Sequence, residues 1–91
     1  MSNITTILTH KVGNYDTWRK AFDAGETNRQ HFGINIKQVF VSNADHNEVT
    51  IIAEGAAGSF DSFMNDTNSQ ASMKEAGVTG EPTLLTLVSR S

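Results

Sequence analysis

The chain has 91 residues, enough for one domain and too few for two. Hydrophobic residues make up 37% of it, but eight of these are alanine, which leaves 26 larger side chains for a core that is thin for a free-standing monomer. The net charge of −3 is spread without any block of like charge, so we expect no nucleic-acid partner. Because cysteine is absent, disulfides, thiolate metal sites and cysteine nucleophiles are excluded.

The first third of the chain predicts a strand followed by a long helix. β-branched residues fill the strand, Ile4 to Val12. Asn14 is the expected N-cap of the helix, and Gly33 its C-terminal stop. Aromatic residues recur along the helix at spacings of three and four, which places them on one amphipathic stripe. These residues are Tyr15, Trp18, Phe22 and Phe32.

The middle of the chain predicts a β-hairpin. Residues 34–42 begin with alternating polar and apolar side chains, and residues 48–54 are again rich in β-branched types. The polar cluster at 43–47 favours a turn between them.

The last third predicts a helix and a final strand. Ser59 is the expected N-cap of a second helix, and the polar run at 66–69 predicts a kink or restart with Ser69 as a new cap. Gly77 ends this helix, and Thr83 to Ser89 form the fourth strand after the single proline.

The element order is strand, helix, strand, strand, helix, strand. With right-handed crossovers, this order predicts an α+β domain of the ferredoxin-like βαββαβ type, in which two helices cover one face of a four-stranded antiparallel sheet. We expect residues 1–91 to form this single domain. The N-terminus lacks the apolar stretch of a signal peptide, and no apolar run approaches the roughly 20 residues of a membrane span, so we expect a cytoplasmic protein without a membrane partner.

Both faces of the predicted sheet are apolar. Ile4 and Leu8 lie on one side of the first strand and Ile7 on the other, and leucines fall on both sides of the last strand. The helices can cover only one face, so the other needs a cover that a second copy supplies most simply. We therefore predict a homodimer through the sheet faces.

The run from Val12 to Asp23, V-G-N-Y-D-T-W-R-K-A-F-D, resembles the opening of small proteins in the dimeric α/β-barrel superfamily. This superfamily includes antibiotic-biosynthesis-monooxygenase, EthD-like and stress-responsive proteins and many uncharacterised members. The run from Ser69 to Val78, followed by Pro82, is similar to their second-helix ending, and Asn14 replaces their usual acidic residue with another N-capping one. The resemblance implies a homodimer with sheets packed face to face. It also implies a small aromatic, polyketide or haem-like ligand between helices and sheet or inside the barrel.

Two interpretations of His10 stay open. Its parity matches Ile4 and Leu8, so it can face a pocket beside Tyr15 and Trp18 as a proton acceptor. Alternatively, it is a half-exposed histidine at a strand end that bonds to a loop.

For the other candidate residues, a functional role and a purely structural role are both open. Tyr15, Trp18 and Phe22 either pack the core, line a ligand pocket, or do both. Glu54 is either a buried carboxylate of the pocket, whose pKa burial would raise, or an exposed charge at a strand end.

We expect no metal site, because the three histidines lack metal-ligand spacing. His31 suits the C-terminal end of the first helix, and His46 falls in the polar turn. The Gly55 to Gly58 segment lacks the lysine of a phosphate loop.

The predicted function is binding of a small apolar or aromatic ligand. Catalysis, if present, would be cofactor-independent and monooxygenase- or cyclase-like, with His10 as base and Tyr15 and Trp18 positioning the substrate. The alternative is a non-catalytic binding or stress-related accessory dimer, and an ACT-type regulatory module also stays open. RNA-recognition, cysteine-ligated and acylphosphatase-like functions lack the residues that they require.

Overall fold

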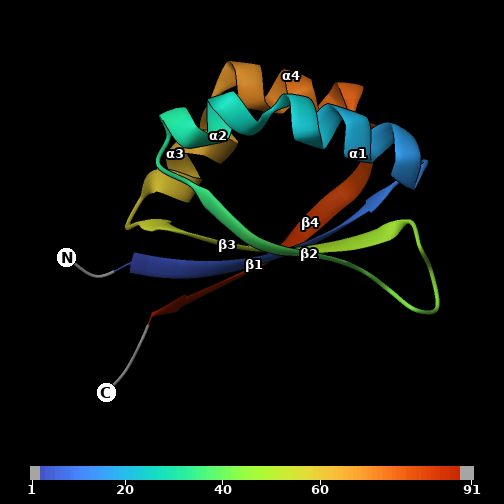
Figure 1. Ribbon diagram of the computed structural model, residues 1–91, viewed down its shortest axis with the longest axis horizontal. Coiled ribbons are helices and arrows are strands. Elements are labelled where there is room, and N and C mark those ends of the chain that lie inside the picture. The colour runs from blue at the N-terminus through green and yellow to red at the C-terminus, as the bar shows by residue number, and fades with distance from the viewer. Residues whose placement is uncertain (1–2, 89–91) are drawn as a thin grey trace.

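The computed structural model describes residues 3–88 and confirms the ferredoxin-like α+β fold. The sheet has the order β2-β3-β1-β4 with antiparallel neighbours throughout, and the helices form a layer on one of its faces (Figure 1). No helix within residues 3–88 is long and apolar enough to cross a membrane. The elements are β1 (Asn3–Val12), α1 (Tyr15–Ala24), α2 (Glu26–His31), β2 (Asn35–Val41), β3 (Glu48–Ala56), α3 (Ser59–Asn65), α4 (Thr67–Glu75) and β4 (Val78–Val88).

The first helical segment is capped as predicted but is not one helix. Asn14 Oδ1 accepts a hydrogen bond from the Thr17 N–H at 3.0 Å and begins α1. Gly25 separates α1 from α2, because glycine is the weakest helix former here and its N–H is shared between two carbonyls of the preceding turn. At the far end, Gly33 takes a φ of +74°, and the Ile34 N–H bonds to the Arg29 carbonyl at 3.0 Å, which closes α2 with a Schellman motif.

The second helical segment restarts three residues earlier than predicted. Asp66, rather than Ser69, caps α4, because its carboxylate accepts the Ser69 N–H at 3.0 Å. In the same way, Gly58 occupies the N-cap position of α3, and Ser59 is the first helical residue.

β4 also begins earlier than predicted, at Val78, and the predicted end at Ser89 lies outside the described residues. Lys11 pairs with Thr79, and Thr9 pairs with Thr83, so three residues of β4 lie opposite His10 alone. Such a bulge bends an edge strand and is common beside functional sites. Pro82 is tolerated in it because β4 has a neighbour on one side only.

The parity of the central strands decides which side chains face the helices. Thr6, Leu8, His10 and Val12 of β1 are buried against the helix layer. Leu8 and Val12 form the hydrophobic core with Trp18 of α1 and the inward side chains of β3. Thr6 and His10 are buried polar residues on the same face. The helix-covered face is therefore the one that carries His10.

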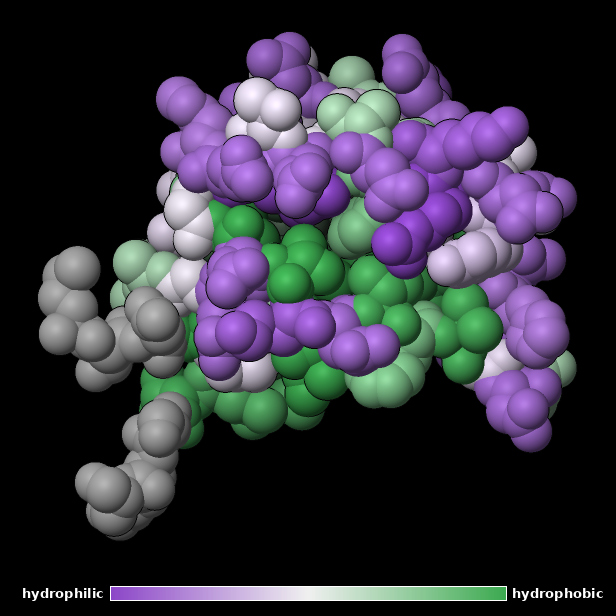
Figure 2. Space-filling model, in the orientation of Figure 1, coloured by the Kyte–Doolittle hydropathy of each residue, from purple (hydrophilic) through white to green (hydrophobic). Residues whose placement is uncertain are grey.

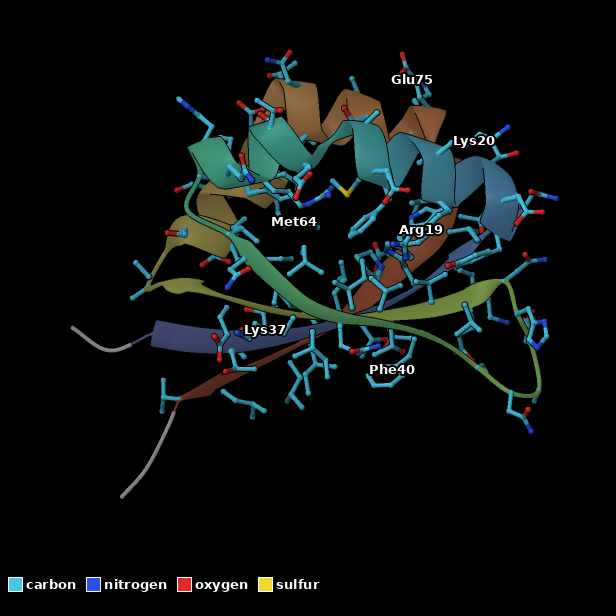
Figure 3. The ribbon with its side chains drawn as sticks, viewed as in Figure 1. Arg19, Lys20, Lys37, Phe40, Met64 and Glu75 are labelled. Atoms are coloured by element: carbon cyan, nitrogen blue, oxygen red, sulfur yellow. The ribbon has the colours of Figure 1, made fainter. Side chains whose placement is uncertain are left out.

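The opposite face of the sheet is uncovered and apolar, as the strand patterns predicted. Ile7 of β1 pairs with Ile52 of β3 and with Leu85 of β4, which forms one apolar row across the sheet. Leu85 is 52% exposed and Phe40 is 50% exposed. Figure 3 shows Phe40 on the side away from the helices, and in Figure 2 hydrophobic atoms gather along the sheet beneath a polar helix layer.

Candidate functional site

A cavity of about 70 Å³ lies between the helix layer and the sheet. We call it the inner cavity. Its floor is formed by β1, β2 and β3, and its walls and roof by the helices, so every layer of the fold contributes. The lining is largely apolar and contains no Asp or Glu side chain within the described chain. An apolar lining with a few polar groups is typical of small-molecule sites.

His10 projects from β1 into the wall of the inner cavity. Its side chain is buried, with a residue exposure of 5%, and neither Nδ1 nor Nε2 has a hydrogen-bond partner among residues 3–88. Burial lowers the pKa of His10 below its ordinary value, because desolvation penalises the imidazolium. The side chain is therefore neutral at pH 7, so one ring nitrogen is free to accept a proton and the other to donate a hydrogen bond.

Trp18 and Phe22 form an aromatic wall beside His10. The rings of His10 and Trp18 meet edge to face with their centroids 5.7 Å apart, and Phe22 stacks on Trp18 at 4.7 Å. Both residues line the inner cavity, so here core packing and pocket lining coincide. Tyr15 packs on the indole of Trp18 at 5.7 Å, outside the lining of the cavity. It supports the wall without facing the cavity.

Arg29 is a residue of this site that the sequence analysis missed. It lines the inner cavity from α2 with only 8% of its surface exposed. Its guanidinium carbon lies 3.9 Å from the centroid of the Phe22 ring, a cation–π contact, and its Nε has no hydrogen-bond partner in the described chain. The signal was present in the sequence, because Arg29 follows Phe22 by two helical turns on the same stripe.

A hydrogen-bonded network closes the helical side of the cavity. Asn28 Nδ2 donates to Ser69 Oγ at 2.9 Å, and Ser69 Oγ lies 3.3 Å from the Asp66 carboxylate, to which it donates. Ser69 is fully buried. The network therefore links α2 to α4. Ser69 Oγ both accepts and donates a hydrogen bond within the protein.

An outer cleft of about 330 Å³ adjoins the inner cavity between α1, α2 and β2. Phe22, Arg29 and Ile36 line both spaces, so these side chains form the partition between them. The mouth of the cleft is charged: Arg19, labelled in Figure 3, pairs with Asp23 at 3.2 Å, and Glu26 lies nearby. A ligand that reaches His10 from the cleft passes the Phe22–Arg29 stack.

Glu54 lies apart from His10. It is on the uncovered face of the sheet, opposite Thr5, and its carboxylate pairs with Lys37 at 3.6 Å. It borders a separate hollow of about 50 Å³ near the Gly55 to Gly58 segment. The structure thus brings His10, Trp18 and Phe22 together and leaves Glu54 outside their cavity.

The other two histidines are exposed and away from the cavity. His31 ends α2, where it packs on the Phe32 ring at 5.4 Å, and His46 lies in the turn between β2 and β3.

Comparison with known proteins gives a family and a fold. The model of a domain of unknown function, DUF3764, matches residues 2–89. No curated protein matches the sequence. Among solved structures, the chain is similar to a variant of SnoaB, a cofactor-independent oxygenase from Streptomyces nogalater, with a TM-score of 0.75, 12% identity, and coverage of 100% of this chain and 96% of that one.

Two further solved structures show the same fold. An antibiotic biosynthesis monooxygenase gives a TM-score of 0.73 at 14% identity, with 97% of this chain and 99% of that chain covered. The monooxygenase from the gene ActVA-Orf6 of Streptomyces coelicolor, in complex with the ligand Nanaomycin D, gives 0.63 at 18% identity, with 99% and 89% covered. These likenesses confirm the fold that the sequence predicted.

Proposed function

Because the chain belongs to the DUF3764 family of domains of unknown function, and its fold is that of the antibiotic biosynthesis monooxygenases, we propose that it binds a small aromatic ligand in the inner cavity and oxidises it without a cofactor. The supporting relatives are a cofactor-independent oxygenase and a monooxygenase with a bound organic ligand. Because the identities are below 20%, what these proteins share with this chain is the fold. The proposed function is therefore argued from the residues of this chain.

The observation that carries the proposal is the state of His10. Buried polar groups normally have a hydrogen-bond partner, and neither nitrogen of the buried His10 imidazole has one among the described residues. A ligand that presents an acidic O–H or C–H group to it would supply the missing partner. Because the lowered pKa keeps His10 neutral, its free nitrogen is ready to accept that proton.

The proposed reaction balances without an external reductant. His10 takes a proton from a ring methylene activated by a neighbouring carbonyl, and the resulting carbanion passes electrons to O₂. Oxygen then adds to this carbon, the resulting peroxide anion takes the proton back from His10, and loss of water from the hydroperoxide leaves a ketone. One oxygen atom enters the product and the other leaves as water, so substrate and O₂ exchange all the electrons between them. Trp18 and Phe22 hold the ring and keep bulk water away.

A second candidate function is ligand binding without chemistry. It is favoured by one observation, that no carboxylate or other polar group of residues 3–88 orients the imidazole of His10. Catalytic bases usually have such an orienting group. In this alternative, His10 hydrogen-bonds a ligand that stays unchanged.

We also propose that two copies form a homodimer through the uncovered sheet faces. Leu85, Leu87 and Phe40 are 41–52% exposed on this face, around the central Ile7 and Ile52. Contiguous apolar side chains of this kind mark interaction surfaces in soluble proteins. A second copy presents the same surface, so the contact is self-complementary.

Oxygen consumption tests the enzymatic proposal. The probe is anthrone, a tricyclic ketone with an acidic ring methylene, in buffer that contains isotopically labelled O₂ and a metal chelator. We expect one labelled atom in the product ketone and a rate that falls about a hundredfold or more in His10→Gln, in line with the usual contribution of a general base. His46→Gln, in the exposed turn, is the matched control and retains the rate. Equal rates in both variants would contradict the role of His10, and binding of anthrone without oxygen uptake would favour the non-catalytic alternative.

A further inference from the structure

We propose that Arg29 binds a carboxylate of the ligand, so that the site selects aromatic acids over neutral aromatic molecules. This inference deepens the proposed function and rests on its ligand site. It adds a substrate class that neither the fold nor His10 implies.

The first argument is that Arg29 has no ion-pair partner within the described chain. The ion pairs of residues 3–88 are Lys11–Asp45, Arg19–Asp23 and Lys37–Glu54, and none includes Arg29. An arginine residue with only 8% of its surface exposed normally has a carboxylate or several acceptors around its guanidinium. Here its Nε has none, and burial lowers the pKa of the side chain because desolvation penalises its charged form. An anionic partner from outside the chain would complete the site.

The second argument is that the guanidinium is held in place before a ligand arrives. Its central carbon, Cζ, lies over the Phe22 ring, 3.9 Å from the ring centroid. Gly25, one turn before Arg29, leaves it room: a Cβ atom at position 25 would lie 3.1 Å from Nη1. The φ of Gly25 is −86°, which other residues adopt, so the space and not the backbone conformation favours glycine here. A pre-positioned planar group loses little freedom when it binds a planar carboxylate.

The third argument is the distribution of acidic groups around Arg29. Asp23 and Glu26 are close enough to raise its pKa by their charge, but both line the outer cleft, and Asp23 is already paired with Arg19. The inner cavity has no acidic lining residue, and its second titratable group, His10, is neutral at pH 7. An anion is therefore attracted to the partition, where the guanidinium of Arg29 is the sole positive charge in the described lining of the inner cavity.

These positions define the ligand. Its ring fits the apolar part of the inner cavity, against Trp18 and Phe22, and its carboxylate reaches Arg29 at the partition with the cleft. The reacting or hydrogen-bonding group of the ring faces His10. A single ring with one acidic substituent is the smallest ligand that reaches both His10 and Arg29, and a larger ring system extends from the inner cavity into the outer cleft.

Equilibrium binding of benzoate and its neutral isostere benzamide tests this inference. Titrations under nitrogen follow the emission of Trp18, the single tryptophan of the chain, with calorimetry as a second readout. We expect the native protein to bind benzoate about tenfold to a hundredfold more tightly than benzamide, as charge-assisted hydrogen bonds predict. Arg29→Gln should remove this preference, and Arg29→Lys, which keeps the charge without the planar fork, should retain part of it.

Lys20→Gln is the matched control, because it removes the same charge from the outer surface of α1 (Figure 3) and should leave the preference unchanged. Circular dichroism verifies that each variant is folded. Equal affinity of the native protein for both probes, binding of neither, or an undiminished preference in folded Arg29→Gln would overturn the inference. Neither probe has a methylene to oxidise, so its result is independent of turnover. Anthrone oxidation without benzoate preference contradicts only the role of Arg29, and benzoate preference without oxidation contradicts only the enzymatic proposal.

Discussion

The imidazole of His10 meets the indole of Trp18 edge to face, with an angle of 71° between the ring planes and 5.7 Å between the centroids. The contact joins the candidate base to the only tryptophan of the chain. Trp18 is 2% exposed, so its emission reports on the cavity rather than on bulk solvent. The protonation state of His10 is therefore measurable without a label.

Titration of Trp18 emission should give the pKa of His10. An imidazolium at this distance quenches indole emission, whereas neutral imidazole does so weakly. Because burial lowers the pKa, we expect the quenching midpoint below the ordinary value of 6.5. His10→Gln should abolish the transition and His46→Gln should leave it in place. A midpoint at or above 6.5 in the native protein would show that the imidazole is solvated or paired with an anion.

Replacing His10 should stabilise the fold while it removes function. At pH 7.5, we expect His10→Leu to raise the free energy of unfolding by about 1 kcal/mol, because it removes buried polar atoms that lack partners. The difference should widen as the pH falls below 6.5, since the unfolded native sequence then binds a proton that the folded state resists. It should stop widening below the folded pKa, where both states are protonated.

Urea unfolding at a series of pH values measures this effect. His46→Leu, at an exposed position, serves as the control and should follow the native curve. A loss of stability in His10→Leu that is the same at every pH would indicate that His10 is an ordinary core residue.

The connection between α2 and α4 depends on Ser69. We expect Ser69→Ala to lower the free energy of unfolding by about 1–3 kcal/mol, because the Asn28 amide loses its acceptor and the Asp66 carboxylate loses a donor. Ser62→Ala, on the exposed side of α3, should change it by less than about 0.5 kcal/mol. If denaturant titration gives the same small change for both variants, the network does not hold the helix layer together.

The elements of this fold could be predicted because their signals are local. Asn14, Gly33 and the aromatic stripe mark the first helical segment within a few residues of its actual ends. These local signals fail where a residue far away in the sequence determines the structure. β4 begins at Val78 because that residue pairs with Val12, far away in the sequence, and no local pattern near Pro82 indicates this. The break at Gly25 was missed because one glycine is compatible with a continuous helix.

The site could be predicted in part for the same reason. His10, Trp18 and Phe22 come from two neighbouring elements whose periodicities place them on facing sides. The sequence alone does not show which alternate side chains of β1 face the helices. Ile4 and Ile7 are equally apolar, and only the helix layer distinguishes their faces. Arg29 was missed because charged residues are normally solvated, even though it lies on the same stripe as Phe22.

The two faces of β4 allow a direct test of the proposed dimer. Leu84 and Leu85 are adjacent and similarly exposed, at 42% and 52%, but Leu85 belongs to the uncovered face with Ile7, whereas Leu84 pairs with the helix-facing Leu8. Leu85→Glu places a charge in the proposed interface, where it would be desolvated without a partner. We expect the native protein to sediment as a dimer at micromolar concentration, and Leu85→Glu to raise the dissociation constant about a hundredfold or more. Leu84→Glu introduces the same charge on the other face and should remain dimeric. A native mass near the 9.9 kDa of one chain, or equal dissociation of both variants, would show that another surface covers this sheet.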